Sequence, residues 1–257
     1  MAIVIKAADA AELSRKLFDL DPPKSNNYRH YSKRQKERGW FSRAMSTLAV
    51  ANPTLFPCEC EESESPDFRL TSREESVIGV EVTGMHDEAE MRNSAILRQK
   101  AKAEGKTEWS VIYSSPAKRL VDTREASLEH LGSRMKRNIM SSPPVSGYAA
   151  EKAWVDQLRS LVSGKNEKLQ NYDVKIEQRW LVVADSSAWR GYIDSETWSV
   201  LLEYLREETA TINSGEAFQR VLVLTRDMKM LEIVDRDVRE HAIIDHWHEF
   251  VGTTHSN

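Results

Sequence analysis

The chain has little of what marks several common protein classes. Its 257 residues contain only two cysteines, Cys58 and Cys60, which excludes a disulfide framework and favours a reducing compartment. No apolar run approaches the roughly 20 residues of a membrane-spanning helix, and the one at residues 1–6 is too short for a signal peptide. The formal net charge is only −4, so any surface for nucleic acid would have to be a local patch. We expect a soluble, cytoplasmic protein.

Several widespread catalytic motifs are also missing. The sequence has no glycine-rich phosphate loop, no Gly-x-Ser-x-Gly elbow and no His-Glu-x-x-His motif, which excludes the commonest nucleotide, serine and zinc hydrolases. Cys58 and Cys60 could form half of a metal site, but no second pair exists, which favours small buried side chains. His241, His246 and His248 lack the spacing of a metal site, so we expect a structural or surface role for them.

A carboxylate stands inside an apolar strand pattern at residues 77–84. Strand alternation places Glu81 and Thr83 on one face, with Gly79 leaving space beside them. The other face is apolar and consists of Ile78, Val80 and Val82. An unpaired carboxylate there would cost several kcal/mol, or would have a shifted pKa, unless a cation or a water-filled cleft meets it. A metal site is the simplest explanation.

Together with Pro66-Asp67, this strand resembles the PD-(D/E)XK nuclease superfamily. In that family an Asp after Pro and an acid two residues before a Lys, on adjacent strands, hold Mg²⁺ against the scissile phosphate. The resemblance implies that Asp67, Glu81 and the backbone carbonyl of Val82 bind Mg²⁺ or Mn²⁺. Thr83 departs from the pattern because it stands at the position of the catalytic lysine. The superfamily also contains branches with Glu-Val-Thr-like endings and with a lysine supplied from a following helix.

A helix that starts near Glu151 could supply this lysine. Its apolar residues fall on one stripe of a 3.6-residue period, namely Trp154, Leu158, Leu161, Val162 and Leu169. If the helix continues through Gly164, Lys165 lies near the centre of the stripe and Lys168 at its edge, where either could act in the site. If the helix ends at Gly164, both lysines are merely solvated.

The order of the expected elements agrees with the resemblance. We expect helices at 8–20 and up to residue 51, strands at 55–60, 66–71 and 77–83, a helix from 151, a strand at 180–185, a helix at 196–212, and a hairpin of strands at 220–225 and 229–234. Residues 86–147, with a helix at 86–105 and a strand at 109–113, form an expected insertion. The fold class is therefore α/β, with a restriction-endonuclease-like α-β-β-β-α-β core, a mixed central sheet flanked by helices, and C-terminal additions within one domain, 1–257.

Residues 24–43 contain seven basic residues and only one acid, Glu37, with aromatic residues among them. Cations and rings are what a phosphate backbone and exposed bases bind. Together with a second basic cluster, this segment predicts contacts to nucleic acid by Arg29, Lys33, Arg34, Lys36, Arg134, Lys136 and Arg137. The same composition also fits a solvated helix face with its aromatics turned inward. By the resemblance, Glu37 could add a further acid to the metal site.

Two functions follow. The first is a Mg²⁺-dependent nuclease, of bacterial or phage type, that hydrolyses phosphodiester bonds of DNA, with RNA as the other candidate substrate. The alternative is a catalytically inactive protein of the same fold that binds nucleic acid or a protein partner.

Overall fold

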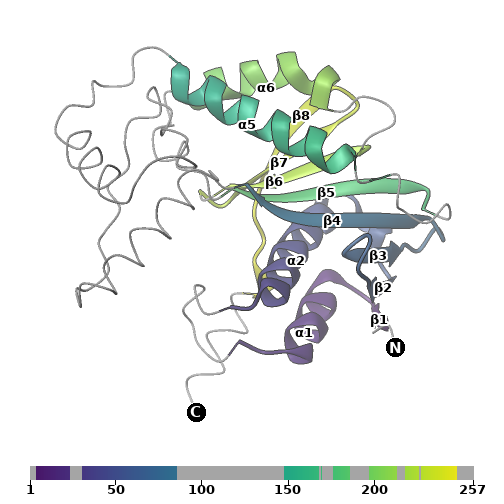
Figure 1. Cartoon of the computed structure of the whole chain (residues 1–257). Coiled ribbons are helices and arrows are strands. Elements are labelled where there is room, and N and C mark those ends of the chain that lie inside the picture. The colour runs from purple at the N-terminus through teal and green to yellow at the C-terminus, as the bar shows by residue number, and fades with distance from the viewer. Residues whose placement is uncertain are drawn as a thin grey trace, which may run out of the picture. The chain divides into compact units, whose positions relative to one another are not determined.

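An open, mixed sheet of eight strands organises the described part of the chain (Figure 1). The computed structural model describes residues 4–23, 31–85, 148–167, 169, 176–185, 197–212, 218–225 and 227–247. The strands are β1 (Val4–Ala7), β2 (Cys58–Glu62), β3 (Phe68–Thr71), β4 (Val77–Met85), β5 (Gln178–Asp185), β6 (Arg220–Leu224), β7 (Lys229–Val234) and β8 (Asp237–Ala242). Their order across the sheet is their order along the chain.

The strand directions divide the sheet into three parts. Strands β1 to β4 pair antiparallel, β5 pairs parallel with β6, and β6 to β8 again pair antiparallel. The backbone N–H of Glu177 donates to the carbonyl of Val77 at 2.9 Å, so β5 begins beside the start of β4. Parallel neighbours need a long crossover, and helix α6 (Trp198–Ile212) supplies it between β5 and β6.

The described residues contain three further α-helices, α1 (Ala10–Leu20), α2 (Lys33–Ala51) and α5 (Ala149–Asn166). Helix α1 begins after Asp9, whose side chain accepts a hydrogen bond from the Glu12 backbone at 2.8 Å. Helix α2 begins with a capping box between Ser32 and Gln35, which satisfies backbone donors at the helix start. It ends before Asn52-Pro53, as expected, since the residue before a proline disfavours helical backbone.

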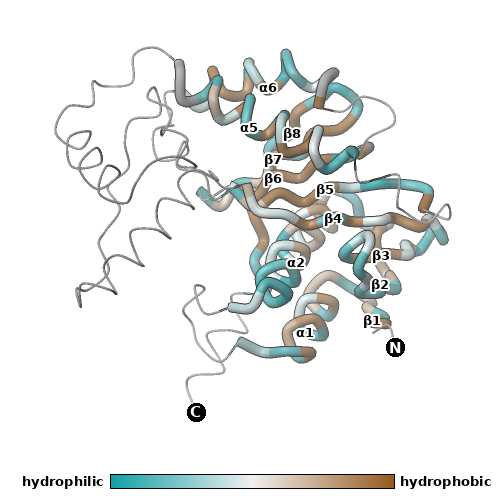
Figure 2. Tube along the Cα trace, in the orientation of Figure 1, coloured by the Kyte–Doolittle hydropathy of each residue, from teal (hydrophilic) through white to brown (hydrophobic). Residues whose placement is uncertain are grey.

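Helices α1 and α2 cover one face of the first strands, and strand alternation explains which face (Figure 1). The inward residues of β2 to β4 are Cys58, Cys60, Phe68, Leu70, Ile78, Val80 and Val82. They pack against Leu13, Leu17, Phe41, Met45 and Leu48 of the two helices. Phe41 stacks on Phe68 with ring centroids 4.1 Å apart. The middle of β5 and most of β6 and β7 are apolar (Figure 2), as is typical of strands buried on both faces.

The chain divides into two compact units. The larger consists of residues 1–84, 159–185 and 206–257 and contains α1, α2, the last turns of α5 and α6, and nearly all of the sheet. The smaller consists of residues 85–158 and 186–205, of which the structure describes Met85, Tyr148–Leu158 and 197–205. The expected insertion at 86–147, with its helix and strand, lies outside the described residues.

The α/β class and the mixed sheet are confirmed, as are the strand at 180–185 and the hairpin of β6 and β7. The helices expected at 8–20, up to residue 51, from 151 and at 196–212 are confirmed as well. The strand expected at 55–60 is wrong at both ends, because Pro53–Leu55 forms a 3₁₀ turn and the strand runs from Cys58 to Glu62. Two edge strands, β1 and β8, were not predicted, since β1 has only four residues and half of the residues of β8 are charged. No helix among the described residues combines the length and apolar character needed to cross a membrane.

The two cysteines give a test of this core. Both are free and buried, and burial raises the pKa of the Cys58 thiol to about 12 and the pKa of Cys60 as well. Because the thiolate is the reactive form, we expect neither cysteine to react with iodoacetamide at pH 8 in the native protein, and both to react in urea. Mass spectrometry of the alkylated protein measures this. Rapid labelling of either cysteine without denaturant would contradict the packing described here.

Candidate functional site

The β3–β4 pair brings the two predicted metal ligands, Asp67 and Glu81, together. Phe68 pairs with Val80, so the residue before Phe68 lies across from the residue after Val80, and their side chains share one face of the sheet. The Asp67 carboxylate accepts a hydrogen bond from the Val82 backbone N–H at 2.8 Å, which fixes its direction.

Glu81 lies in a setting that disfavours its negative charge. Its side chain is 13% exposed. Burial, and then the nearby charge of Asp67, raise the pKa of Glu81, and the opposing effect of Lys165 does not cancel them. Two largely buried carboxylates on one face of neighbouring strands repel each other, and a bound cation would relieve this repulsion.

Lys165 supplies a positive charge from a distant part of the sequence. Helix α5 continues through Gly164, and the ammonium nitrogen of Lys165 lies 3.4 Å from Glu81 Oε1. The two residues are 84 positions apart. Thr83, partly buried on the same face of β4, occupies the position where the resembled family has its lysine. Helix α5 therefore places a positive charge beside Glu81, whereas Lys168 lies outside the described residues.

Glu37 extends the cluster from the helix side. Its side chain is only 5% exposed, and burial, followed by the charge of Asp67, raises its pKa. Two cations on α2 partly offset this, with Lys33 Nζ 3.3 Å and Arg34 Nη1 3.6 Å from its carboxylate. The structure thus places Glu37 in the same group of charges as Asp67 and Glu81.

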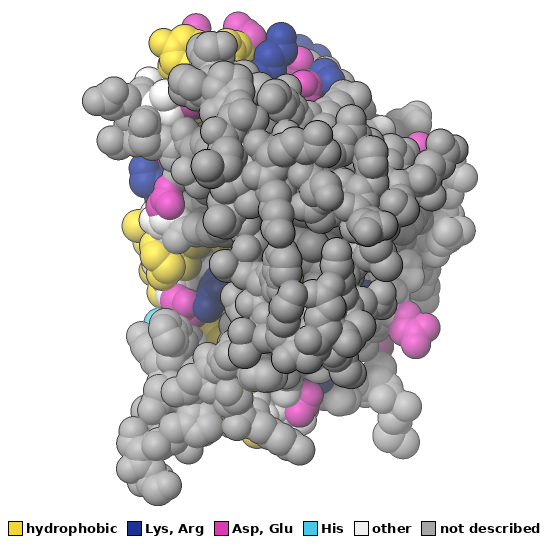
Figure 3. Space-filling model, turned by 60° about the vertical axis from the view of Figure 1, so that its left-hand side comes forward, with side chains coloured by type: hydrophobic (Ala, Val, Ile, Leu, Met, Phe, Trp, Pro, Cys, Tyr) yellow, Lys and Arg dark blue, Asp and Glu magenta, His cyan; other side chains and the backbone are white. Residues whose placement is uncertain are grey.

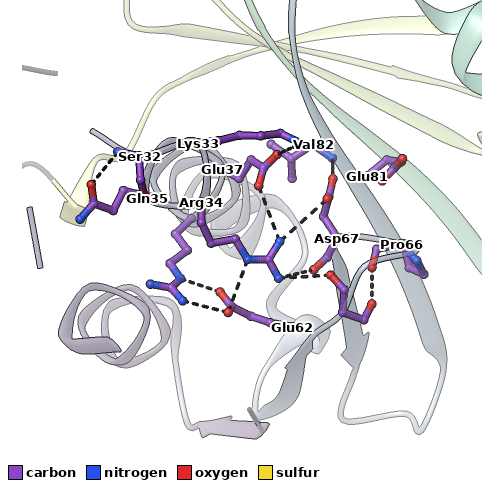
Figure 4. Close-up of polar contacts among 12 residues, drawn as sticks. Ser32, Lys33, Arg34, Gln35, Glu37, Glu62, Pro66, Asp67, Glu81 and Val82 are labelled. Atoms are coloured by element: carbon purple, nitrogen blue, oxygen red, sulfur yellow. Dashed lines mark hydrogen bonds and ion pairs between the residues drawn. The ribbon is translucent and has the colours of Figure 1, made fainter. Parts of the chain in front are cut away.

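Two further members of the cluster, Glu62 and Arg38, were not predicted. Arg38 holds Glu62 through two hydrogen bonds, from Nε at 2.6 Å and from Nη2 at 2.9 Å. The Arg34 guanidinium lies between Glu62 and Asp67 (Figure 4). A signal for Glu62 existed, because it follows Cys58 and Cys60 on the inward face of β2, but the predicted strand ended too early to include it.

The predicted contacts to nucleic acid differ in their surroundings. Lys33 is 89% exposed, Lys36 is partly buried, and Arg34 is surrounded by acceptors of its own chain. Arg29, Arg134, Lys136 and Arg137 lie outside the described residues. Basic and acidic side chains lie next to one another over the described part of the face in Figure 3.

The donor set suits a cation such as Mg²⁺. No group of three or more His, Cys, Asp and Glu is arranged around a metal position within the described ranges. Mg²⁺, however, is commonly held by one or two carboxylates, while waters and substrate phosphates complete its octahedron. The Asp67 and Glu81 pair provides such donors. A contribution from the Val82 carbonyl stays a prediction.

Cys58, Cys60 and His241, which belong to the other residue types that commonly bind metals, are buried in the core or have a partner of their own. Cys58 and Cys60 are buried under α1 and α2. His241 Nε2 lies 2.8 Å from the buried Glu232 carboxylate, which also pairs with Arg220 at 3.3 Å, as a structural role would require. His248 lies outside the described residues.

The space expected beside Glu81 is filled, so the prediction for Gly79 is wrong. A Cβ at residue 79 would lie 2.9 Å from the Ile176 side chain and 3.0 Å from Pro66, the neighbour of Asp67. A Cβ at Gly164 would meet nothing within 4 Å. The glycine at 79 is therefore required by close packing, and the glycine at 164 is not.

These two glycines form a matched pair for mutation. We expect Gly79→Ala to lower the free energy of unfolding by about 1–3 kcal/mol, because the added methyl overpacks the site. Gly164→Ala should raise it by about 0.5–1 kcal/mol through helix propensity. Urea denaturation measures both changes. Equal effects of the two variants would contradict the packing around Gly79.

The raised pKa of Glu81 predicts how stability depends on pH. A carboxyl group that binds its proton more readily in the folded state destabilises the protein increasingly as the pH rises from its unfolded pKa through its folded pKa. Without divalent metal, Glu81→Gln should therefore raise Tm at pH 8, by about 2–4 °C if the gain is roughly 1 kcal/mol. The gain should vanish near pH 4, where the wild-type group is protonated in both states. Thermal unfolding in EDTA at both pH values tests this, and a lower Tm at pH 8 would contradict it.

Comparisons with family models, with curated proteins and with solved structures gave no match to this chain. The function is therefore inferred from the site itself.

Proposed function

We propose that this protein is a Mg²⁺- or Mn²⁺-dependent nuclease that hydrolyses phosphodiester bonds, with DNA as the first substrate to test. The observation that carries the proposal is the position of Lys165. Its ammonium nitrogen lies 3.4 Å from Glu81, which faces Asp67 across two adjacent strands. Two acids and a lysine thus converge from three elements, in the combination that metal-assisted phosphodiester hydrolysis uses.

The order of elements supports the same proposal. Among the described elements, α2 to β5 run helix, strand, strand, strand, helix, strand, with residues 86–147 between β4 and α5 outside the description. Asp67 comes immediately before the second of these strands and Glu81 lies in the middle of the third. This is the order expected of a restriction-endonuclease-like core with an insertion before its second helix, and α5 is the next described helix after the strand that carries Glu81.

The chemistry divides between a cation and the residues of the chain. A bound divalent cation would supply charge stabilisation at the phosphate and a more acidic water. Asp67 and Glu81 would hold it, and the hydrogen bond from Val82 N–H keeps Asp67 in the direction that this requires. Lys165, whose side chain is 20% exposed, would orient the attacking water and stabilise negative charge that develops on the phosphate. Lys33 is exposed on α2 and would contact the phosphate backbone.

Cleavage assays test the proposal. With Mg²⁺ or Mn²⁺, we expect the wild type to cut DNA, and we expect Asp67→Asn and Glu81→Gln to lose cleavage. Lys165→Gln should lower the rate by about 10²-fold or more, because it removes a group that acts in the transition state. Glu59→Gln is the matched control for Glu81→Gln, since Glu59 is 47% exposed on β2, two strands away in the same sheet, and pairs only with Lys6 among the described ion pairs. Its cleavage should equal that of the wild type.

A binding measurement separates the two candidate functions. A ligand that binds only the native state raises stability, by about 2.7 kcal/mol at 100 times its dissociation constant. We expect Mn²⁺ to raise the Tm of the wild type and of Lys165→Gln, but not of Asp67→Asn. Salt-sensitive DNA binding without cleavage, and without stabilisation by Mn²⁺, would instead support the inactive alternative.

A further inference from the structure

Arg34 lies among five oxygen atoms of its own chain. Nε is 3.6 Å from a Glu62 oxygen, and Nη1 is 3.6 Å from Glu37 and 3.9 Å from the Asp67 carboxylate. Nη2 donates to two backbone carbonyls, of Ser63 at 3.2 Å and of Asp67 at 3.4 Å. A guanidinium carries five N–H groups in a planar fork, so each of its nitrogens already faces acceptors within the protein.

The face and the neighbours of this guanidinium are also fixed. Its central carbon lies 5.2 Å from the centroid of the Phe68 ring, and Phe41 stacks on that ring from α2. Arg38 holds Glu62 by its two hydrogen bonds, so Glu62 is a fixed partner for Arg34. The Arg34 guanidinium is therefore held along its edge by acceptor oxygens and on its face by the Phe68 ring, and Arg38 fixes its partner Glu62.

We infer that Arg34 is a positioning residue of the acid site and not a contact for nucleic acid. Its guanidinium binds Asp67 at the carboxylate and at the backbone carbonyl, which together set both the side chain and the turn that precedes β3. The same nitrogen that faces the Asp67 carboxylate also faces Glu37, so one cation holds the two acids toward a common point. The consequence for metal binding rests on the proposed function.

The neighbouring residue makes the contrast clear. Lys33 is 89% exposed, and among the described residues its ammonium group pairs only with Glu37. A phosphate at Lys33 would compete with this one carboxylate, whereas a phosphate at Arg34 would compete with five oxygens of the chain. The two adjacent basic residues therefore differ in role, because Lys33 faces solvent and Arg34 faces the acids of its own chain.

The role depends on the shape of arginine as well as on its charge. A lysine presents its donors at a single point on a flexible stem and cannot face Glu62, Glu37 and the two carbonyls at once. Arg34→Lys keeps the charge and loses the fork, while Arg34→Gln loses both. A phosphate contact would be largely preserved in the lysine variant, because lysine also binds phosphate as a point charge.

A double-mutant cycle tests the contact to Asp67 without any assay of activity. Urea unfolding is measured for the wild type, Arg34→Gln, Asp67→Asn and the double variant, in EDTA. We expect Arg34→Gln to lower the unfolding midpoint in the wild type and to lower it much less beside Asp67→Asn, since residues in contact are not additive. Arg15→Gln, an exposed position on α1, is the control and should be additive with Asp67→Asn. Additive effects of Arg34→Gln would overturn the inference.

Titrations with Mn²⁺ and with a short fluorescein-labelled DNA duplex test the consequence for the site. We expect both Arg34→Gln and Arg34→Lys to weaken Mn²⁺ binding by about 10-fold or more, as loss of residues that orient metal ligands does. Their affinity for the duplex, measured without divalent metal, should equal that of Arg15→Gln. Weakened DNA binding of Arg34→Gln, restored by Arg34→Lys, would overturn the inference and return Arg34 to the nucleic-acid surface.

The double-mutant cycle and the titrations distinguish a failure of the proposed function from a failure of the role inferred for Arg34. If the wild type binds no Mn²⁺, the proposed function fails, and the cycle in EDTA still decides whether Arg34 positions Asp67. If the wild type binds Mn²⁺ and Arg34→Lys binds it equally well, the proposed function stands and the role of Arg34 is refuted. If Arg34→Gln does not fold, the cycle is made with Arg34→Lys, for which the expectation is the same.

Discussion

Four carboxylates, Glu37, Glu62, Asp67 and Glu81, have side chains that are at most 15% exposed, and they meet around the start of β3. Such a group is unfavourable unless cations lie among its members, because burial weakens the hydration of each charge and like charges repel. Arg38 neutralises Glu62 directly, Arg34 stands between three of the acids, and Lys165 approaches Glu81 from the far end of the cluster. The surrounding helices and strands keep these positive and negative side chains next to one another.

Helix α2 contributes most to this balance, and its position is fixed from both sides. Its inner face packs on the strands through Phe41 and Phe68. A second face of the helix, formed by Gly39, Arg43 and Thr47 at intervals of about one turn, contacts the segment that follows β8. There the Ile244 N–H donates to Thr47 at 3.0 Å, Asp245 pairs with Arg43 at 2.7 Å, and the Trp247 ring lies over Gly39. Residues near the end of the chain thereby hold the helix that carries Glu37, Arg34 and Arg38.

The other side of the acid pair is held by packing. Ile176, just before β5, and Pro66, just before Asp67, both fill the space over Gly79. A side chain at residue 79 would press on both Ile176 and Pro66, so the glycine on β4 helps to place Asp67, which follows Pro66 just before β3. A network of ion pairs on one side and a close apolar contact on the other thus converge on Asp67. This is the residue whose direction the proposed chemistry requires most.

The sequence by itself determined two kinds of feature: the elements that follow from local periodicity, and the single charged residue that interrupts an apolar pattern. Alternation in 77–84 identified a strand and identified Glu81 as an acid that needed a partner, and the helical stripe from Glu151 continued far enough to include Lys165. It could not assign Arg34, because an arginine bound to acids of its own fold and an arginine that faces phosphate look alike until their neighbours are known. Only the tertiary structure decided that Asp67 faces Glu81, that Lys165 lies beside Glu81, and that other side chains fill the space next to Gly79. Each of these depends on strand register or on contacts between residues far apart in the chain, and neither leaves a trace in the local pattern.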